Sequence, residues 1–243
     1  MQGFRCFLSG VIILSIIMTG CKVQQSSDQM LIFSATKGFR HKSIPDGIHA
    51  LKLLALKNKI IPISSEDPAL FTHDNLKKYK VIVFLSTSGS FLNDEQKESF
   101  RKYIQNGGGF VGIHAATTSF YEWEWYNKMI GAWFINHPPI QPAMLIIKDN
   151  NHPSTKHLPE RWEHTDEWYN FKSISPDINV LITVDEKSYK GGQNGNFHPV
   201  SWYHTFEGGR VFYTAMGHSG ETYSDKLFLE HLEGGLKWAL RRN

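Results

Sequence analysis

Short, mainly apolar runs alternate with longer segments of helical periodicity over the first half of the chain. Residues 30–35, 81–85 and 110–113 have the length and composition of strands buried within a parallel sheet. Between them, apolar positions recur every three or four residues, which is typical of helices with one buried face. This alternation predicts right-handed βαβ units and therefore an α/β fold with a parallel sheet.

Local signals place the ends of several of these elements. A further apolar run, 59–64, contains Pro62, and a proline within a strand indicates an edge position. Ser43 is expected to cap the helix that follows it. Asn93 and Gln96 have the spacing of a capping box, which predicts a helix start at this point.

The pattern changes after residue 141. Segments of alternating polarity predict antiparallel strands, or a mixed extension of the sheet, at residues 144–147, 180–184, 199–203 and 209–214. Residues 224–240 then have the periodicity of a final helix. Gly234 and Gly235 inside it indicate close packing, because two helical glycines cost about 2 kcal/mol relative to alanine.

The beginning of the chain has the pattern of a bacterial lipoprotein signal. Arg5 precedes an apolar stretch that is too short to span a bilayer, and Met18-Thr19-Gly20-Cys21 follows it. Cleavage before Cys21 would leave a lipidated cysteine, so we expect attachment to the bacterial cell envelope, periplasmic or at the outer membrane, by the lipid alone. The predicted division is a signal peptide, a polar tether and one α/β domain, at residues 1–20, 21–29 and 30–243.

Composition excludes several classes of function. The formal net charge is +3, and no block of lysine and arginine indicates nucleic-acid binding. The only other cysteine, Cys6, lies in the predicted signal peptide, so the domain has neither a disulfide nor a thiol nucleophile. A serine-hydrolase elbow, a P-loop and a dinucleotide-binding glycine motif are all missing from the sequence.

Histidines follow several of the predicted strands. His41, His114 and His218 each start a loop, and the carboxyl ends of parallel strands share one edge of a sheet. We therefore expect these three to meet there, with His137 as a further member, and His114 at a sharp strand–turn–helix junction. Together with a carboxylate they could hold zinc, manganese or iron. The alternative is a set of separate structural histidines bonded to the backbone.

Acidic and aromatic residues supply the other candidates. Asp166 and Glu167 are adjacent carboxylates flanked by aromatic residues, and burial could raise the pKa of either toward that of a base. The alternative is a solvated charged face. In the aromatic segment that follows His114, Trp123 is expected in the core, whereas Trp133 is either core or one wall of a sugar site.

Four blocks in order resemble the ThuA-like (trehalose utilisation) family over residues 30–240. They are Gly38-Phe39-Arg40-His41, residues 107–114, Asp166-Glu167-Trp168-Tyr169 and residues 209–218. The resemblance implies a class I glutamine amidotransferase-like fold, a flavodoxin-like three-layer sandwich whose mostly parallel central sheet has an antiparallel extension. True amidotransferases have a cysteine nucleophile where this chain has His114, so the resemblance does not extend to glutaminase activity.

The family is associated with bacterial disaccharide use, including routes through 3-keto sugars. The resemblance therefore implies an enzyme of disaccharide or glycoside catabolism, a hydrolase, lyase or isomerase that uses acid–base chemistry with or without a divalent metal. The expected catalytic residues are His114, His218, Asp166 and Glu167, and the expected substrate-binding residues are Arg40, His41, Trp133 and Tyr169. The alternative is a non-catalytic sugar-binding lipoprotein, and association into a homo-oligomer stays open.

Overall fold

A computed structural model describes residues 3 and 28–242. The predicted signal peptide and the lipidation site Cys21 lie outside the described residues, as does most of the tether. Strand β1 (Gln29–Phe33) begins on the last residue of the predicted tether, so the folded domain starts one residue earlier than expected. Among the described residues, no helix combines the length and the apolar character needed to cross a membrane.

A nine-stranded sheet forms the centre of the domain, in the order β2-β1-β3-β5-β13-β12-β11-β8-β9. The first five of these strands are parallel, as the sequence predicted for this part of the fold. They are β2 (Ile61–Ser65), β1, β3 (Tyr79–Leu85), β5 (Gly109–Ile113) and β13 (Gly209–Thr214). The four that follow are antiparallel: β12 (Pro199–Phe206), β11 (Asn179–Val184), β8 (Gln141–Ile147) and β9 (Arg161–Asp166).

The structure decides one alternative and adds one strand. For residues 209–214 the sequence predicted antiparallel strands or a mixed extension of the sheet, and the mixed alternative holds, because β13 pairs in parallel with β5 and antiparallel with β12. Strand β9 was not expected at all, although its alternating burial is that of an edge strand with one buried face. Two small sheets accompany the large one, β4 (Ser88–Gly89) with β6 (Thr118–Ser119) and β7 (Trp133–Asn136) with β10 (Asn170–Lys172).

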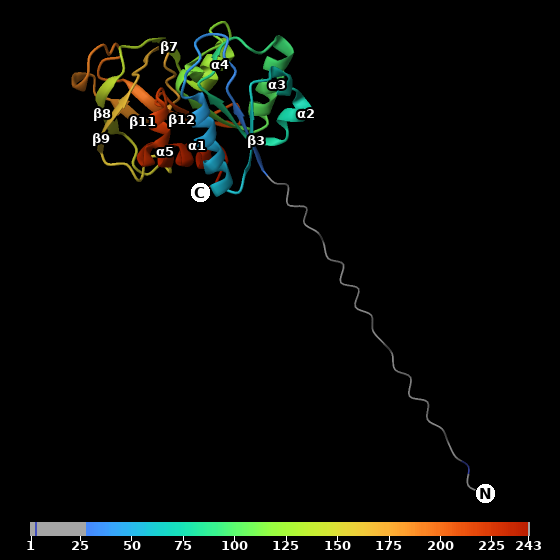
Figure 1. Cartoon of the computed structure of the whole chain (residues 1–243). Coiled ribbons are helices and arrows are strands. Elements are labelled where there is room, and N and C mark those ends of the chain that lie inside the picture. The colour runs from blue at the N-terminus through green and yellow to red at the C-terminus, as the bar shows by residue number, and fades with distance from the viewer. Residues whose placement is uncertain (1–2, 4–27, 243) are drawn as a thin grey trace.

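Helices cover both faces of the large sheet (Figure 1). Helices α1 (Ile44–Lys57) and α5 (Lys226–Ala239) pack on one face, where a β-carbon at Gly235 would collide with the ring of Phe212. Helices α3 (Asp94–Gln105) and α4 (Glu124–Ile130) pack on the other, where the ring centroids of Phe84 and Phe100 are 5.4 Å apart. The short α2 (His73–Leu76) lies beside α3. The close packing predicted at Gly234 and Gly235 is confirmed.

The helix ends agree with the sequence at one site and differ at another. Both hydrogen bonds of the capping box between Asn93 and Gln96 are present. Ser43 does not cap α1, because its hydroxyl instead donates to the carbonyl of Gly217 over 3.1 Å. This bond ties the start of α1 to the loop after β13. The 3-10 helices are η1 (Pro68–Leu70), η2 (His114–Thr117), η3 (Glu186–Ser188) and η4 (Gly220–Ser224).

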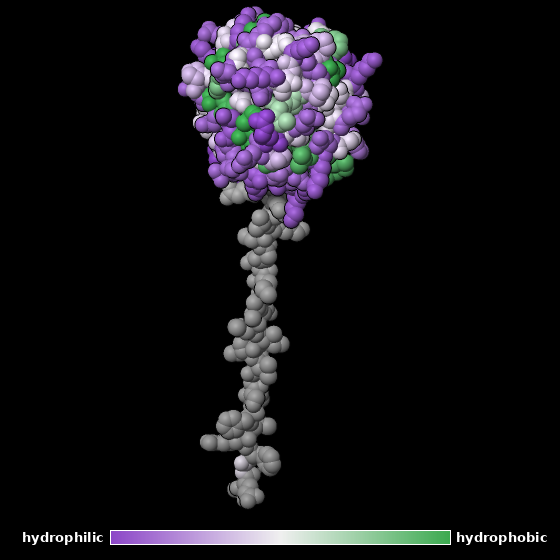
Figure 2. Space-filling view, turned by 90° about the vertical axis from the view of Figure 1, so that its left-hand side faces the viewer, coloured by the Kyte–Doolittle hydropathy of each residue, from purple (hydrophilic) through white to green (hydrophobic). Residues whose placement is uncertain are grey.

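The core takes up most of the aromatic residues, including Trp123, as expected from the sequence. Strand β2 lies at the edge of the sheet, which confirms the position indicated by Pro62. Figure 2 shows one face of the molecule, where hydrophilic residues predominate and hydrophobic residues gather only in small groups. Such scattered apolar residues are normal on the surface of a folded domain.

Candidate functional site

Three neighbouring parallel strands end beside one another at the same edge of the sheet. Strand β3 is followed by Ser86, β5 by His114 and the segment after β13 by Gly217, and each of these residues has a positive φ, 48°, 51° and 117° respectively. This conformation is uncommon for residues other than glycine, so the turns at Ser86 and His114 must be held by their surroundings. At His114 the hydroxyl of Tyr213 donates to the backbone carbonyl over 2.8 Å.

The imidazoles of His41, His114 and His218 meet at this edge, together with the carboxylate of Glu167. The Nε2 atom of His114 lies 3.0 Å from Nε2 of His41 and 3.3 Å from Nδ1 of His218. The Oε2 atom of Glu167 lies 3.1 Å from Nδ1 of His218 and 3.5 Å from Nε2 of His114. All four ligand atoms lie within 4.8 Å of one another. We call these four residues the histidine–glutamate cluster.

The hydrogen bonds of His114 fix its proton. Its Nδ1 atom lies 2.7 Å from the carbonyl oxygen of Ala215, which is only an acceptor, so Nδ1 carries the hydrogen. The lone pair of the neutral ring is then on Nε2, which faces the other members of the cluster. A ring that donates its outer N–H to a carbonyl and presents its inner nitrogen is the usual arrangement of a metal-binding histidine.

The spacing of the cluster suits a small divalent cation. Tetrahedral zinc with bonds of about 2.0–2.1 Å has ligand atoms roughly 3.3–3.4 Å apart, and three of the cluster distances range from 3.1 to 3.5 Å. Three nitrogens and a carboxylate oxygen are also a donor set that zinc, manganese or iron accepts. His137, predicted as a ligand, lies outside the four-atom set. Its Nδ1 atom is instead 3.0 Å from Oε1 of Glu167, whereas the cluster distances involve Oε2 of the same carboxylate.

Charge within the cluster is distributed unevenly. Burial, followed by the nearby charge of His114 and His218, lowers the pKa of His41 to about 3. The hydrogen bond that His218 donates to Glu167 outweighs burial and raises the pKa of His218. Burial would raise the pKa of Glu167, but its interactions with His114 and His218 more than offset this and hold its pKa well below the usual range. An ionised carboxylate therefore faces neutral His41.

Asp166, predicted as catalytic beside Glu167, has a different position. Its side chain is fully buried and accepts hydrogen bonds from the backbone amides of Glu167, Gly217 and His218, at 2.8, 2.8 and 3.1 Å. Burial alone would raise the pKa of Asp166, but its bond to His164 and the other interactions lower it. Asp166 thus fixes the two backbone segments that carry Glu167 and His218, and we regard it as a positioning residue.

Tyr169 lies within the site, as predicted. Its hydroxyl is 3.0 Å from Nε2 of His114, and burial raises the pKa of the phenol well above its usual value, so it stays protonated. The backbone carbonyl of Tyr169 lies 2.8 Å from Nε2 of His198, whose Nδ1 is 2.7 Å from Oε1 of Glu186. No sequence signal indicates this buried support, because neither His198 nor Glu186 lies in a recognisable motif.

A cavity of about 490 Å³ opens over the cluster. It is lined by Gly38, Phe39, His41, Ser88, Gly89, Ala115, Thr118, Tyr121, Phe134, His137, Glu167, Tyr169 and His218. Sequence reasoning missed the aromatic walls Phe39, Tyr121 and Phe134. Phe39 lies two residues before His41 in the motif at residues 38–41, and this position could have identified it. Tyr121 and Phe134 lie in a segment with many aromatic residues, so no signal distinguished them.

Two predicted substrate-binding residues do not reach this cavity. Arg40 points to the surface and forms a two-pronged ion pair with Glu66, with N–O distances of 2.7 and 3.0 Å. Trp133 lines a separate cavity and has the amine of Lys172 over its ring at 5.7 Å. The structure therefore brings together six of the predicted residues, namely His41, His114, His137, Glu167, Tyr169 and His218.

Comparisons with known proteins agree with this architecture. A family model described as trehalose utilisation, ThuA, matches residues 29–239. A ThuA-like protein structure from Bacteroides uniformis has 25% identity and a TM-score of 0.75, covering 88% of this chain and 91% of the other. One from Parabacteroides merdae has 21% identity and a TM-score of 0.72, with the same coverage.

More distant likeness extends to part of a larger enzyme. A β-galactosidase from Bacillus circulans has 15% identity and a TM-score of 0.58 over 87% of this chain and 31% of its own, a similarity of fold alone. A comparison of the sequence with curated proteins finds no match.

Proposed function

The chain belongs to the ThuA (trehalose utilisation) family, and from this premise we propose that it is an enzyme that cleaves or converts a glycoside or 3-keto-glycoside by metal-assisted acid–base chemistry. The family supports a role in sugar metabolism, whereas the reaction is our proposal. The observation that carries it is the convergence of four ligand atoms within 4.8 Å beneath an open cavity. Cavities with a few convergent polar groups are typical of small-molecule sites.

His137 is the group best placed to act as a base. Its Nδ1 atom lies 3.0 Å from both Oε1 of Glu167 and the carbonyl oxygen of Pro138. Both neighbours are acceptors, so Nδ1 carries the hydrogen and Nε2 of the neutral ring has the free lone pair. His137 lines the cavity and is partly exposed, so a substrate can reach it. Glu167 would orient the ring and stabilise its charged form.

The proposed step is an elimination from a 3-keto-glycoside. The ketone at C3 acidifies the hydrogen on C2, and His137 takes that proton. The electron pair of the broken C2–H bond then forms the C1–C2 double bond as the bond from C1 to the glycosidic oxygen breaks. The protonated imidazole then returns the proton to the departing oxygen, so that atoms and charge balance. Tyr169, held in its protonated state, would donate a hydrogen bond to the negative charge that develops on the ketone oxygen.

The cluster would contribute a cation to the same site. A divalent ion held by His41, His114, His218 and Glu167 supplies Lewis acidity toward a sugar oxygen. His114 is prepared for this by its bond to Ala215, and Asp166 holds the segments of the other two ligands that follow β9 and β13. Burial of the cluster would strengthen each of these interactions by excluding water.

The test combines metal analysis with deuterium exchange. The purified full chain, with zinc or manganese added, is incubated in D₂O with glycosides and their 3-keto forms, and NMR follows exchange at C2 and release of the aglycone. We expect exchange and release with a 3-keto form, both lost on chelation and restored by metal. Binding without exchange or product would instead support the alternative, a non-catalytic sugar-binding lipoprotein.

Two finer features belong to the same proposal. If the five parallel strands are renumbered 1 to 5 by their position in the chain, they lie across the sheet in the order 2-1-3-4-5. This order supports a flavodoxin-like arrangement of the parallel half. For location, we propose a lipid anchor at Cys21 in the bacterial envelope, supported by the sequence around that residue. Labelling with a radioactive fatty acid, present in the full chain and lost in Cys21→Ser, would support the anchor; equal labelling of both would reject it.

A further inference from the structure

A second cavity adjoins the first at the cluster. It has a volume of about 480 Å³ and shares Phe39, His41 and His218 with the cavity described above. Its remaining lining is Lys42, Ser43, Asp46, Ile140, Ser219, Gly220 and Glu221. We call it the polar lobe, and the cavity bounded by Phe39, Tyr121, Phe134 and Tyr169 the aromatic lobe. His41 and His218 face both lobes, so one ligand could extend across the cluster.

Apart from Tyr169, which lies beside the cluster, the hydroxyl groups of the aromatic lobe already donate their hydrogens to backbone carbonyls. Ser88 donates to the carbonyl of Phe39 over 2.8 Å, Thr118 to that of Ala115 over 2.8 Å, and Tyr121 to that of Phe134 over 2.9 Å. A sugar ring buried in this lobe would find few donors outside the cluster for its several hydroxyls. Burying unpaired hydroxyl groups is costly, whereas burying an apolar ring is favourable.

The polar lobe has the opposite character. Lys42, Asp46 and Glu221 are exposed side chains on its wall, and within the described part of the chain none of them forms an ion pair or side-chain hydrogen bond. Two carboxylates can accept hydrogens from sugar hydroxyls, and an ammonium group can donate to their oxygens. Charged groups of this kind hydrogen-bond to hydroxyls more strongly than neutral ones do.

We infer from this asymmetry that the substrate is a glycoside with an aromatic aglycone. The aromatic ring packs between Phe39, Tyr121 and Phe134, and the glycosidic bond lies over the histidine–glutamate cluster. The reacting C2 and C3 of the sugar then lie at the border of the two lobes, beside His137 and Tyr169, and the rest of the sugar extends into the polar lobe. The assignment rests on the proposed function, because that function makes the cluster the reacting centre. It departs from a disaccharide substrate, which would place a second hydroxylated ring in the aromatic lobe.

The experiment measures binding, so it does not depend on turnover. The metal-loaded full chain is titrated calorimetrically with methyl and phenyl glycosides of glucose, galactose and mannose. It is also titrated with the disaccharides in which a glucose unit takes the place of the methyl or phenyl group. We expect at least one phenyl glycoside to bind tenfold or more tightly than both its methyl and its disaccharide counterparts. If no phenyl glycoside exceeds its methyl counterpart, or if a disaccharide binds as tightly as the phenyl compound, the inference is wrong.

Variants assign the two ends of the ligand. Phe134→Ala and Tyr121→Ala should each reduce the ratio of phenyl to methyl affinity by about tenfold, while Asp46→Asn and Glu221→Gln should weaken both ligands by similar factors. Phe197→Ala, which removes an exposed phenylalanine outside both lobes, is the matched control and should leave the ratio unchanged. A ratio that falls in the acidic-residue variants but not in the aromatic ones would reverse the assignment.

The readouts of this inference and of the proposed function are separate. Metal content and deuterium exchange test the reaction, whereas the affinity ratio tests the shape and polarity of the two lobes. A chain that prefers phenyl glycosides but shows no exchange would retain the ligand assignment and lose the proposed reaction. A chain that catalyses exchange on 3-keto forms without preferring aryl glycosides would do the opposite.

Discussion

The two ends of strand β5 differ sharply, although one five-residue strand joins them. At the amino end, Gly108 and Gly109 are packed so closely that a β-carbon at either would collide with Tyr103 or with the backbone of Ala239. At the carboxyl end, His114 belongs to the histidine–glutamate cluster beneath a cavity of about 490 Å³. The same strand thus serves tight packing at one end and leaves an open site at the other.

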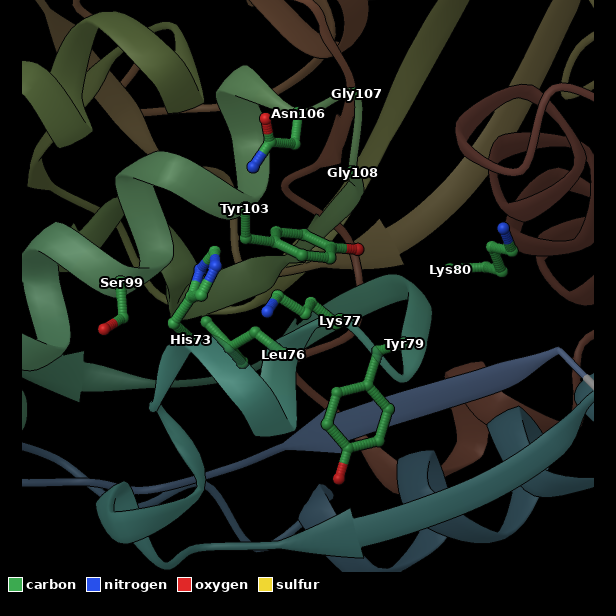
Figure 3. A pocket seen from close by; sticks show the side chains of 10 residues that line it. All are labelled: His73, Leu76, Lys77, Tyr79, Lys80, Ser99, Tyr103, Asn106, Gly107 and Gly108. Carbon is green, nitrogen blue, oxygen red and sulfur yellow. The ribbon is translucent and has the colours of Figure 1, made fainter.

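A cavity also exists at the amino end, which makes the contrast informative. It encloses about 230 Å³ and is lined by His73, Leu76, Lys77, Tyr79, Lys80, Ser99, Tyr103, Asn106, Gly107 and Gly108. In Figure 3 the ring of Tyr103 lies at its centre, near Gly108. The Tyr103 hydroxyl donates to the carbonyl of Gly109, and Lys77 pairs with Asp74. A hollow surface alone therefore does not indicate a reaction; convergent ligand atoms do.

The largest expected effect comes from removing His114. We expect His114→Ala to lose metal binding and to reduce turnover by about 100-fold or more, because the central nitrogen of the cluster is gone. Lys77→Ala at the amino end should leave both unchanged. Metal stoichiometry and exchange rates measure this, and circular dichroism verifies folding. Since His114 has a positive φ, His114→Asn is a second variant that tolerates this backbone. Full metal binding in both variants would contradict the assignment.

Gly109→Ala should affect stability and leave the chemistry unchanged. The added β-carbon would overlap the carbonyl oxygen of Ala239, which is backbone and cannot rotate away. We expect the free energy of unfolding to fall by about 3 kcal/mol, measured by urea titration. The folded fraction at low temperature should keep its metal and its turnover per molecule. Lost metal in a fully folded variant would show that the two ends are coupled.

Acid should weaken the fold through buried histidines away from the cluster. Burial lowers the pKa of His231 to about 3, from an ordinary value of 6.5. The contribution of the neutral, buried His231 to the stability of the fold is fully present above pH 6.5 and is lost as the pH falls toward 3. The reason is that this histidine binds a proton at a higher pH in the unfolded chain than in the folded one. Between pH 7 and pH 5 this one group should lower the free energy of unfolding by about 2 kcal/mol. His231→Phe should flatten that part of the profile; an unchanged slope would contradict the prediction.

The smallest effect is expected at Arg40. Its ion pair with Glu66 is exposed, with 50% and 47% of the two side chains accessible, and such pairs contribute about 0–1 kcal/mol. Arg40→Ala should therefore change neither ligand affinity nor metal content, although Arg40 belongs to the same motif as His41. Calorimetric titration with the phenyl glycoside checks this. A tenfold loss of affinity would return Arg40 to the substrate site.

The parallel half of the fold was accessible from sequence because its signals are local. Continuous apolar runs and the capping box at Asn93 mark elements without reference to the rest of the chain. For β13 the sequence leaves antiparallel and mixed pairing open, because a polarity pattern does not show which neighbours a strand pairs with. Ser43 was misread for a similar reason, since the acceptor of its hydroxyl is Gly217, 174 residues away.

The site shows the same division. The meeting of His41, His114 and His218 was predicted from topology, because parallel strands end at one edge. The direction of each side chain was not, which is why Asp166 and Arg40 were expected to face the substrate. Asp166 instead accepts hydrogen bonds from backbone amides, and Arg40 forms an ion pair with Glu66 on the surface. Such choices depend on partners that are distant in sequence.

Pro62 has a consequence for behaviour at high protein density. It is the second residue of β2, and the amide of the preceding Ile61 donates inward, to the carbonyl of Asp28. Because successive amides of a strand alternate in direction, the position of Pro62 would otherwise present its N–H outward. The outer edge of the sheet thus lacks a hydrogen-bond donor near the start of β2, which disfavours strand pairing with the edge of a neighbouring molecule.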